Sequence, residues 1–249
     1  MSNLLERIKI ITNLFNTIMK TTLNYFLLAL LTVFTSCSSS DDANGNGGGN
    51  GGGNQTSSSY WPFAVGNTWN LVNPENSNDK SDYLIHKTII HDGKTYYQFK
   101  PIGIDADVEL TDGVREENGV FYNLHGATSQ MGIHTSAGII TSMNTKLAVG
   151  EVWTDQVTLT ISGAASGSIK HNYEGKILEK VASVSINNKT YKDVIKTELK
   201  QTVLNSLTGM SFTIVYENWF AKGVGIIYEK NTYDEGSSDE YGLVSYSLK

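Results

Sequence analysis

Short strand-forming runs separated by turn signals fill residues 60–249 and constrain the fold more than any other feature. The clearest is DYLIHKTIIHDGKTYYQFKPI at residues 82–102, in which two β-rich halves meet at Asp92 and Gly93. An Asp-Gly pair between two such runs is a strong hairpin signal. Thr, Val, Ile and Tyr favour strands, and no long segment of helical periodicity separates the runs. The sequence therefore predicts an all-β domain built on an antiparallel sheet.

One of the later runs fits two periodicities. Tyr191, Ile195, Leu199 and Val203 recur every four residues, as on one side of a helix. The stretch from Ile195 to Val203 also alternates apolar and polar residues, and NSLTG then turns the chain into another β-rich run. We therefore expect a strand here. The predicted strands beyond the hairpin are residues 107–110, 119–124, 152–162, 167–181, 190–204, 211–221, 225–232 and 242–248.

The only cysteine, Cys37, follows a segment laid out as a secretory signal peptide. Lys20 supplies the positive start, residues 25–34 form the apolar centre, and small residues precede the cysteine. The apolar centre is short for a membrane span, which needs roughly 20 apolar residues. FTSC resembles a relaxed bacterial lipobox, which implies that Cys37 is lipidated and anchors the chain to a membrane. An ordinary signal peptide that ends near a cysteine is the alternative.

These features predict three regions. Residues 1–36 form the signal region, with Met19 as the expected true start. Residues 37–59 run SSSDDANGNGGGNGGGNQTSSS after the cysteine, a composition typical of a flexible tether with a reach of roughly 25 Å. Residues 60–249 form the β domain, long enough for one sizeable core.

Two acidic residues, Asp41 and Asp42, lie just beyond the cysteine. They resemble the export signal of surface lipoproteins in Bacteroidota, which implies an outer-membrane lipoprotein exposed on the cell surface. The alternatives are a periplasm-facing protein and two solvated charges in a linker.

The charge balance excludes one class of partner. Without Glu6, Arg7, Lys9 and Lys20, the chain from Cys37 onward has 24 acidic and 16 basic residues, a formal charge of −8. An acidic surface repels the phosphates of nucleic acids. We therefore expect no nucleic acid partner.

The pattern A-V-G-x-x-W occurs twice, at FAVGNTWNL and LAVGEVWTD. Gly66 and Gly150 permit tight turns, and Trp69 and Trp153 can each close the end of a core with a large ring. We expect both tryptophans to be buried rather than to form ligand platforms. In KGVGII, Gly223 and Gly225 lack the spacing and the following helix of a phosphate loop, so we expect a bulge or a close backbone approach.

Three segments resemble, in the same order, parts of uncharacterised flavobacterial-type Bacteroidota lipoproteins: WPFAVGNTW, KTYKDVIKTE and WFAKGVGIIYEK, at residues 61–69, 189–198 and 219–230. The resemblance implies a strongly curved antiparallel sheet, half-barrel or barrel-like, akin to that of lipoprotein carriers. It implies no catalytic residue. The tethering of this chain departs from true lipoprotein carriers.

No motif indicates a reaction, a metal or a cofactor. Asp105, Asp107 and Glu109 alternate on one strand face, and a solvated face explains them without calcium. The five histidines show no metal-ligand spacing, and GAASG at residues 163–167 lacks the serine position of a nucleophile elbow. We therefore expect a non-enzymatic envelope protein that binds an apolar molecule, a glycan or an envelope partner. The alternatives are an accessory interaction module with no small-molecule site and a hydrolase whose site assembles in space.

Overall fold

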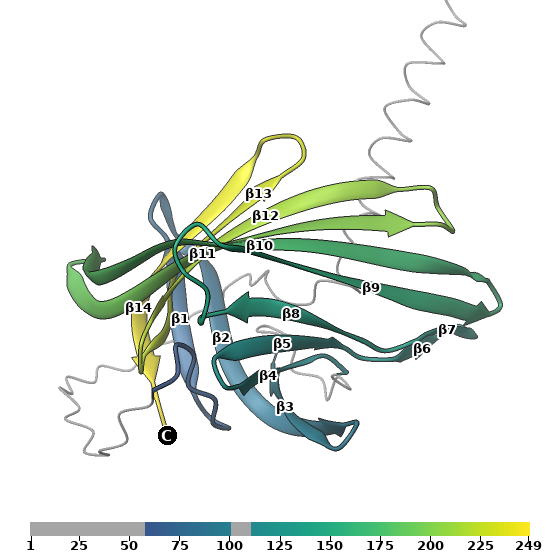
Figure 1. Ribbon diagram of the computed structural model, residues 1–249, viewed down its shortest axis with the longest axis horizontal. Helices are drawn as coiled ribbons and strands as arrows, with labels where there is room; N and C mark the ends of the chain where they lie inside the picture. Colours follow the sequence, from purple (N-terminus) through teal and green to yellow (C-terminus); the bar gives the residue numbers. More distant parts are fainter. Residues whose placement is uncertain (1–57, 101–110) are drawn as a thin grey trace, which may run out of the picture. The chain divides into compact units, whose positions relative to one another are not determined.

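A computed structural model describes residues 58–100 and 111–249, which form an antiparallel all-β domain (Figure 1). One sheet holds the strands in the order β6-β7-β9-β10-β11-β12-β13-β14-β1-β2-β3-β4-β5-β8. No helix in these residues is long and apolar enough to cross a membrane. The strands are β1 (Thr68–Asn73), β2 (Asn76–His91), β3 (Lys94–Phe99), β4 (Gly113–Glu117), β5 (Val120–His125), β6 (Thr128–Gln130), β7 (Ile133–Thr135), β8 (Gly138–Asn144), β9 (Val152–Gly163), β10 (Gly167–Ile186), β11 (Lys189–Asn205), β12 (Ser211–Ala221), β13 (Gly225–Tyr233) and β14 (Ser238–Ser247).

The predicted antiparallel sheet is confirmed, and so is the strand at residues 190–204. The hairpin turn also forms as predicted: Asp92 and Gly93 both have positive φ, 48° and 71°, between β2 and β3. Several strands extend beyond their predicted ends: β2 begins at Asn76, β10 continues to Ile186 and β14 begins at Ser238. The short strands β4, β6, β7 and β8 were not predicted, and the strand expected at residues 107–110 lies outside the described residues.

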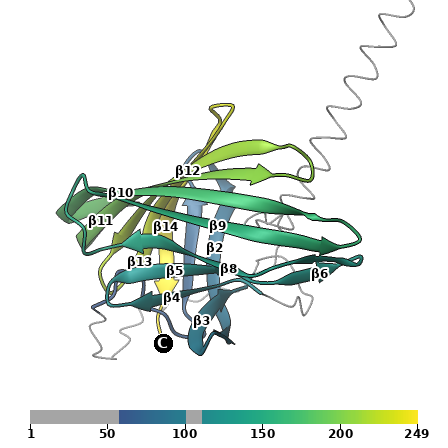
Figure 2. The ribbon, with the colours of Figure 1, turned by 45° about the vertical axis from the view of Figure 1, so that its right-hand side comes forward.

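The sheet curves until its last strand in the order, β8, lies against β9. The backbone N–H of Thr141 on β8 donates to Oδ2 of Asp155 on β9 over 2.7 Å. The indole N–H of Trp153 donates to the carbonyl of Thr141 over 3.1 Å. The sheet is thus bridged by side chains where β8 and β9 meet, and Figures 1 and 2 show these two strands side by side.

An aromatic cluster fills the interior beside the start of the described domain. The ring of Trp61 lies 5.1 Å from that of Phe99, 5.3 Å from that of Phe220 and 5.7 Å from that of Tyr83. Just before it, the carbonyl of Ser59 accepts a hydrogen bond from the backbone N–H of Gly223, and the Ser59 hydroxyl bonds the Glu116 carboxylate. The first residues of the domain are therefore part of its core.

A second apolar cluster lies toward the opposite end of β9, β10, β11 and β12. Its buried members are Leu159, Ile161, Ile169 and Val203, with Ile133, Val157 and Phe212 packed against them. These residues alternate with exposed ones along each strand, as expected for a sheet with one face turned inward. Side chains of both clusters thus occupy the inner face of the sheet.

Candidate functional site

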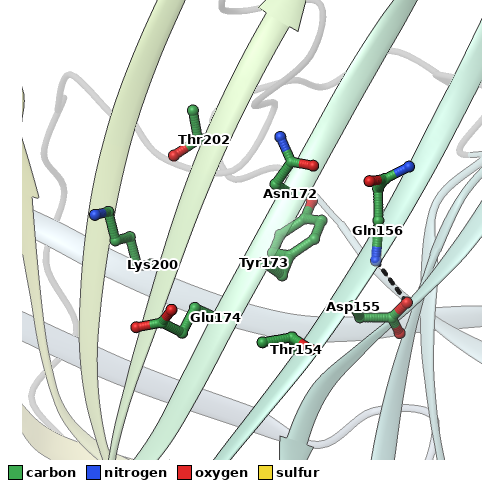
Figure 3. Close-up of a pocket in the computed structure, with 8 residues that line it drawn as sticks. All are labelled: Thr154, Asp155, Gln156, Asn172, Tyr173, Glu174, Lys200 and Thr202. Carbon is green, nitrogen blue, oxygen red and sulfur yellow. Dashed lines mark hydrogen bonds between the residues drawn. The ribbon is translucent and has the colours of Figure 1, made fainter.

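An open groove of about 680 Å³ crosses the outer face of β9, β10 and β11 (Figure 3). Eight residues line it: Thr154, Asp155, Gln156, Asn172, Tyr173, Glu174, Lys200 and Thr202. The even-numbered ones point outward because their odd-numbered neighbours on these strands face the interior. Strand alternation alone therefore gathers six polar side chains on one surface.

The register of the three strands arranges the outward side chains in two rows. Thr154, Glu174 and Lys200 lie directly opposite one another. The second row holds Gln156, Asn172 and Thr202, which also lie opposite one another, two residues away from the first row on each strand. The two rows combine hydroxyls, amides, one carboxylate and one ammonium group. Such a set can donate and accept several hydrogen bonds while its formal charges balance.

A buried polar cluster lies behind the groove and is joined to it by Tyr173. The Tyr173 hydroxyl is 3.0 Å from Nε2 of His125, and it accepts a hydrogen bond of 2.8 Å from Nε2 of Gln201. Gln201 Nε2 also lies 2.9 Å from Nδ1 of His171, and the Tyr216 hydroxyl donates to Gln201 Oε1 over 3.0 Å. The cluster ties β5, β10, β11 and β12 together across the interior.

Burial keeps this cluster uncharged at neutral pH. It lowers the pKa of His171 from 6.5 to about 4, with a smaller contribution from nearby His125. Burial likewise lowers the pKa of His125, opposed by Asp112, and it raises the pKa of Tyr173 well above its usual range. A phenol that holds its proton so strongly is not an activated nucleophile. The arrangement is typical of a hydrogen-bonded core network.

A second buried polar pair joins β2 and β13. The Tyr83 hydroxyl donates to the Glu229 carboxylate, which is 2% exposed. Burial raises the pKa of Glu229 from 4.5 to about 7, although the nearby hydroxyls of Ser81 and Tyr83 oppose the shift. A carboxyl group that takes up a proton near neutral pH is thus enclosed in the fold.

The four glycines singled out from the sequence all have positive φ: 93° at Gly66, 85° at Gly150, 73° at Gly223 and 111° at Gly225. The two A-V-G-x-x-W segments form equivalent turns. In the first, the N–H of Gly66 donates to the carbonyl of Ile85 over 2.8 Å, and in the second Gly150 donates to Ile177 over the same distance. Two separate parts of the sheet therefore begin in the same way.

Both tryptophans of this pattern are buried, as predicted, with exposed fractions of 0% for Trp69 and 9% for Trp153. The Trp69 indole donates to the carbonyl of Val224 over 2.6 Å. A Cβ at Gly225 would come within 2.4 Å of the Trp69 indole nitrogen. This confirms the expected close approach at KGVGII and agrees with a packing role for both glycine and ring.

Several residues predicted from the sequence are not described by the structure. Cys37, Asp41, Asp42 and the acidic residues between 101 and 110 lie outside the described ranges. Within residues 58–100 and 111–249, no group of three or more His, Cys, Asp or Glu side chains could hold a metal ion.

The groove was not found from the sequence. Its outward residues are ordinary polar residues of long strands and therefore look like any solvated strand face. The sequence nevertheless contained a signal for the groove. The triplets T-D-Q on β9, N-Y-E on β10 and K-Q-T on β11 each have two hydrogen-bonding side chains two residues apart, on the same face of the strand. The pairing register, which aligns these groups, could not be read from one sequence.

The chain matches no protein family profile and no curated protein. Two solved structures are similar to it. A candidate lipoprotein from Parabacteroides distasonis is 12% identical, with a TM-score of 0.46 over 78% of this chain and 100% of the other. A candidate exported protein with a YmcC-like fold from Bacteroides fragilis is 11% identical, with a TM-score of 0.41 over 77% of this chain and 100% of the other. Likeness at this level carries no statement about function.

Proposed function

We propose that this chain is a lipid-anchored envelope protein whose β domain binds a neutral, hydroxyl-rich ligand of the oligosaccharide class. The single observation that carries the proposal is the open groove across β9, β10 and β11 with its two rows of outward polar side chains. Anchoring through Cys37 rests on the signal-like segment before it, and surface exposure rests on Asp41 and Asp42.

The chemistry of the groove favours a glycan over the other ligand classes. Hydroxyls from Thr154 and Thr202 and amides from Gln156 and Asn172 suit a ligand that both donates and accepts hydrogen bonds. Glu174 and Lys200 face each other across β10 and β11, so the two outward rows have no net formal charge to attract a strongly charged ligand. The carboxylate of Asp155, the other acidic residue of the lining, accepts the Thr141 amide. An apolar ligand would leave these polar groups without partners, which is unfavourable.

Two observations support a binding role without catalysis. Large side chains occupy the inner face, including fully buried Trp69, Tyr96 and Phe121, which speaks against a carrier of apolar molecules. The histidines and the tyrosine nearest the groove are held neutral by burial. The groove is therefore suited to recognition by hydrogen bonds.

Binding can be tested with the purified full chain and an array of neutral and charged oligosaccharides. We expect neutral glycans to bind, and Asn172→Ala to weaken them several-fold to about tenfold, the effect of losing one or two hydrogen bonds. Thr158→Ala is the matched control, because Thr158 is exposed on the same face of β9 beyond the groove. If Asn172→Ala and Thr158→Ala behave alike, the groove is not the site.

The anchor has its own test. Metabolic labelling with a fatty acid should mark the native chain and not Cys37→Ser, and protease added to intact cells should digest the β domain if it is displayed outside. Equal labelling of both chains would contradict the anchor. An absence of glycan binding together with intact anchoring would favour the second candidate, an accessory interaction module, which the filled interior also fits.

A further inference from the structure

Three loops meet at one end of the domain. They are the β6–β7 turn, the β9–β10 turn and the β11–β12 loop. The backbone N–H of Ala164 donates to the carbonyl of Gly132, and that of Ser206 donates to the carbonyl of Ser168, both over 2.9 Å. Figures 1 and 2 show these loops together at the far ends of β6, β7, β9, β10, β11 and β12. We call this end the tip.

The tip exposes large apolar side chains. Met131 at the β6–β7 turn is 91% exposed, and Leu207 and Met210 in the β11–β12 loop are 43% and 38% exposed. Leu204, at the end of β11, is 41% exposed. The buried cluster around Leu159 and Val203 lies directly beneath them on the same strands. The exposed apolar side chains are therefore supported by a packed apolar cluster.

The three loops of the tip also lack charge, and the Asp234 carboxylate of the adjacent β13–β14 turn is held by the Thr213 amide at the start of β12. Residues 118–145, 156–169 and 201–216, which include all three loops, contain no Asp, Glu, Lys or Arg. The rest of the domain is acidic, so an uncharged end with protruding Met and Leu side chains is unusual for this chain. Groups that enter the boundary between lipid headgroups and acyl chains must be apolar and must not carry charges that lose water there.

We propose that the tip docks on the lipid bilayer, with Met131, Leu207 and Met210 entering the headgroup–acyl boundary. Apolar elements that lie at this boundary typically enter it by about 5–10 Å. A protruding set of loops suits a soft lipid surface, whereas a protein partner of ordinary size needs a broad complementary face. Zwitterionic lipid is the expected surface, because the acidic domain is repelled by anionic headgroups.

The length of chain before the domain fits this orientation. Ser59 binds Gly223 in the β12–β13 turn, whereas the tip lies at the opposite end of β12, whose 11 residues span at most about 35 Å. Twenty residues separate Cys37 from Ser58, and fully extended they reach about 66–72 Å. An anchored chain can therefore return along the domain and leave its tip on the membrane. The docking proposal depends on the tip alone. Only the argument that the chain can bring the tip to the membrane depends on the anchoring through Cys37 proposed above.

Fluorescence quenching by lipid tests the docking. The full chain with Met131→Cys is labelled with an environment-sensitive dye and reconstituted in phosphatidylcholine vesicles whose acyl chains carry bromine. We expect strong quenching at position 131 and little in Ile90→Cys, the control, since Ile90 is 74% exposed and lies beside Asp92 and Lys94 at another hairpin. Adding Leu207→Asp should weaken bilayer contact about tenfold, because a charge replaces an apolar side chain that the bilayer would otherwise take up. Val65→Asp, at an exposed valine of a different turn, should leave it unchanged.

Each outcome bears on one proposal. Equal quenching at positions 131 and 90, or quenching that survives Leu207→Asp, overturns docking, and so does self-association through the tip in place of lipid contact. The native chain takes up dye only if Cys37 is free of lipid, so dye on the native chain counts against the anchor. Docking is measured as the difference in quenching between Met131→Cys and Ile90→Cys. A dye on Cys37 would add equally to both variants and would not change this difference.

Discussion

Trp153 lies directly across from Gly175 in the register of β9 and β10, and its indole occupies the space that a side chain at Gly175 would need. A Cβ at Gly175 would come within 2.0 Å of the ring. The Trp69 ring also lies over a glycine, Gly225 at the start of β13, although β14 separates β13 from β1 in the sheet. Each tryptophan of the repeated pattern thus covers a glycine of another strand.

The variant Gly175→Ala should destabilise the domain by about 1–3 kcal/mol, because the methyl group must displace a buried ring. Urea unfolding of the single variants and of the double variant with Trp153→Ala measures the coupling. We expect the double variant to lose less than the sum of the two, since removing the ring makes room for the methyl group. Additive losses would show that the ring and the glycine are independent.

Removing the buried ring of Trp69 or of Trp153 should strongly destabilise the domain. Trp69→Ala and Trp153→Ala are each expected to lower the free energy of unfolding by about 3–5 kcal/mol. Trp219→Ala is the control, because Trp219 is only partly buried and lies between the Lys196 ammonium at 4.1 Å and the Tyr228 ring at 4.4 Å. Its loss should be smaller. Nearly unchanged melting of Trp69→Ala or Trp153→Ala would contradict the packing role.

Glu229 should make stability depend on pH. Its folded pKa is raised from 4.5 to about 7, so between these values the folded chain keeps a proton that the unfolded chain has released. The free energy of unfolding contributed by this group therefore falls as pH rises from 4.5 to 7, by roughly 3 kcal/mol, and is level above that. Glu229→Gln cannot ionise and should match the native chain near pH 4.5 and exceed it at pH 8.

The histidines act in the opposite direction, so the comparison with Glu229→Gln is essential. The folded pKa of His171 is lowered to about 4, so its contribution to stability is lost as pH falls from 6.5 toward 4. This background is present in both chains and cancels in their difference. A difference between the native chain and Glu229→Gln that is the same at pH 4.5 and pH 8 would contradict the raised pKa of Glu229.

Hydrogen exchange can measure how strongly the Asp155 carboxylate on β9 holds the Thr141 amide on β8. Asp155→Ala removes the acceptor of the Thr141 amide and should cost about 1–3 kcal/mol locally, equivalent to roughly 5- to 150-fold faster exchange of that amide. Asp234 accepts the Thr213 amide in the same way, also over 2.7 Å. Asp234→Ala should therefore release Thr213 and leave Thr141 protected. Unchanged exchange of Thr141 in Asp155→Ala would show that the bridge does not hold β8.

Much of the fold followed from local chemistry. Asp92-Gly93 specifies its turn because both residues must adopt positive φ, and the β-branched runs specify the long strands. The strands β6 and β7 were missed because each has only three residues, and β8 was missed because its sequence, GIITSMN, has no regular alternation of apolar and polar residues. Their pairing is fixed by partners distant in the sequence, such as Thr135 opposite Ile161.

The candidate site was less accessible to sequence reasoning. His125 and His171 are 46 residues apart, yet their rings stack with centroids 5.0 Å apart. Their contact depends on β5 crossing the inner face opposite β10, which no local pattern records. The groove depends in the same way on the register of three strands.

The placement of Trp61 has a mechanical consequence. Because Ser59 is hydrogen-bonded to the β12–β13 turn and Trp61 is surrounded by Phe99, Phe220 and Tyr83, a pull on the chain ahead of Ser58 meets an aromatic plug before it reaches β1. Extracting that plug means exposing a large ring and its neighbours to water together, rather than peeling a strand one bond at a time. Force applied to the chain ahead of Ser58 would thus act first on the aromatic interior of the domain and only then on the hydrogen bonds of β1.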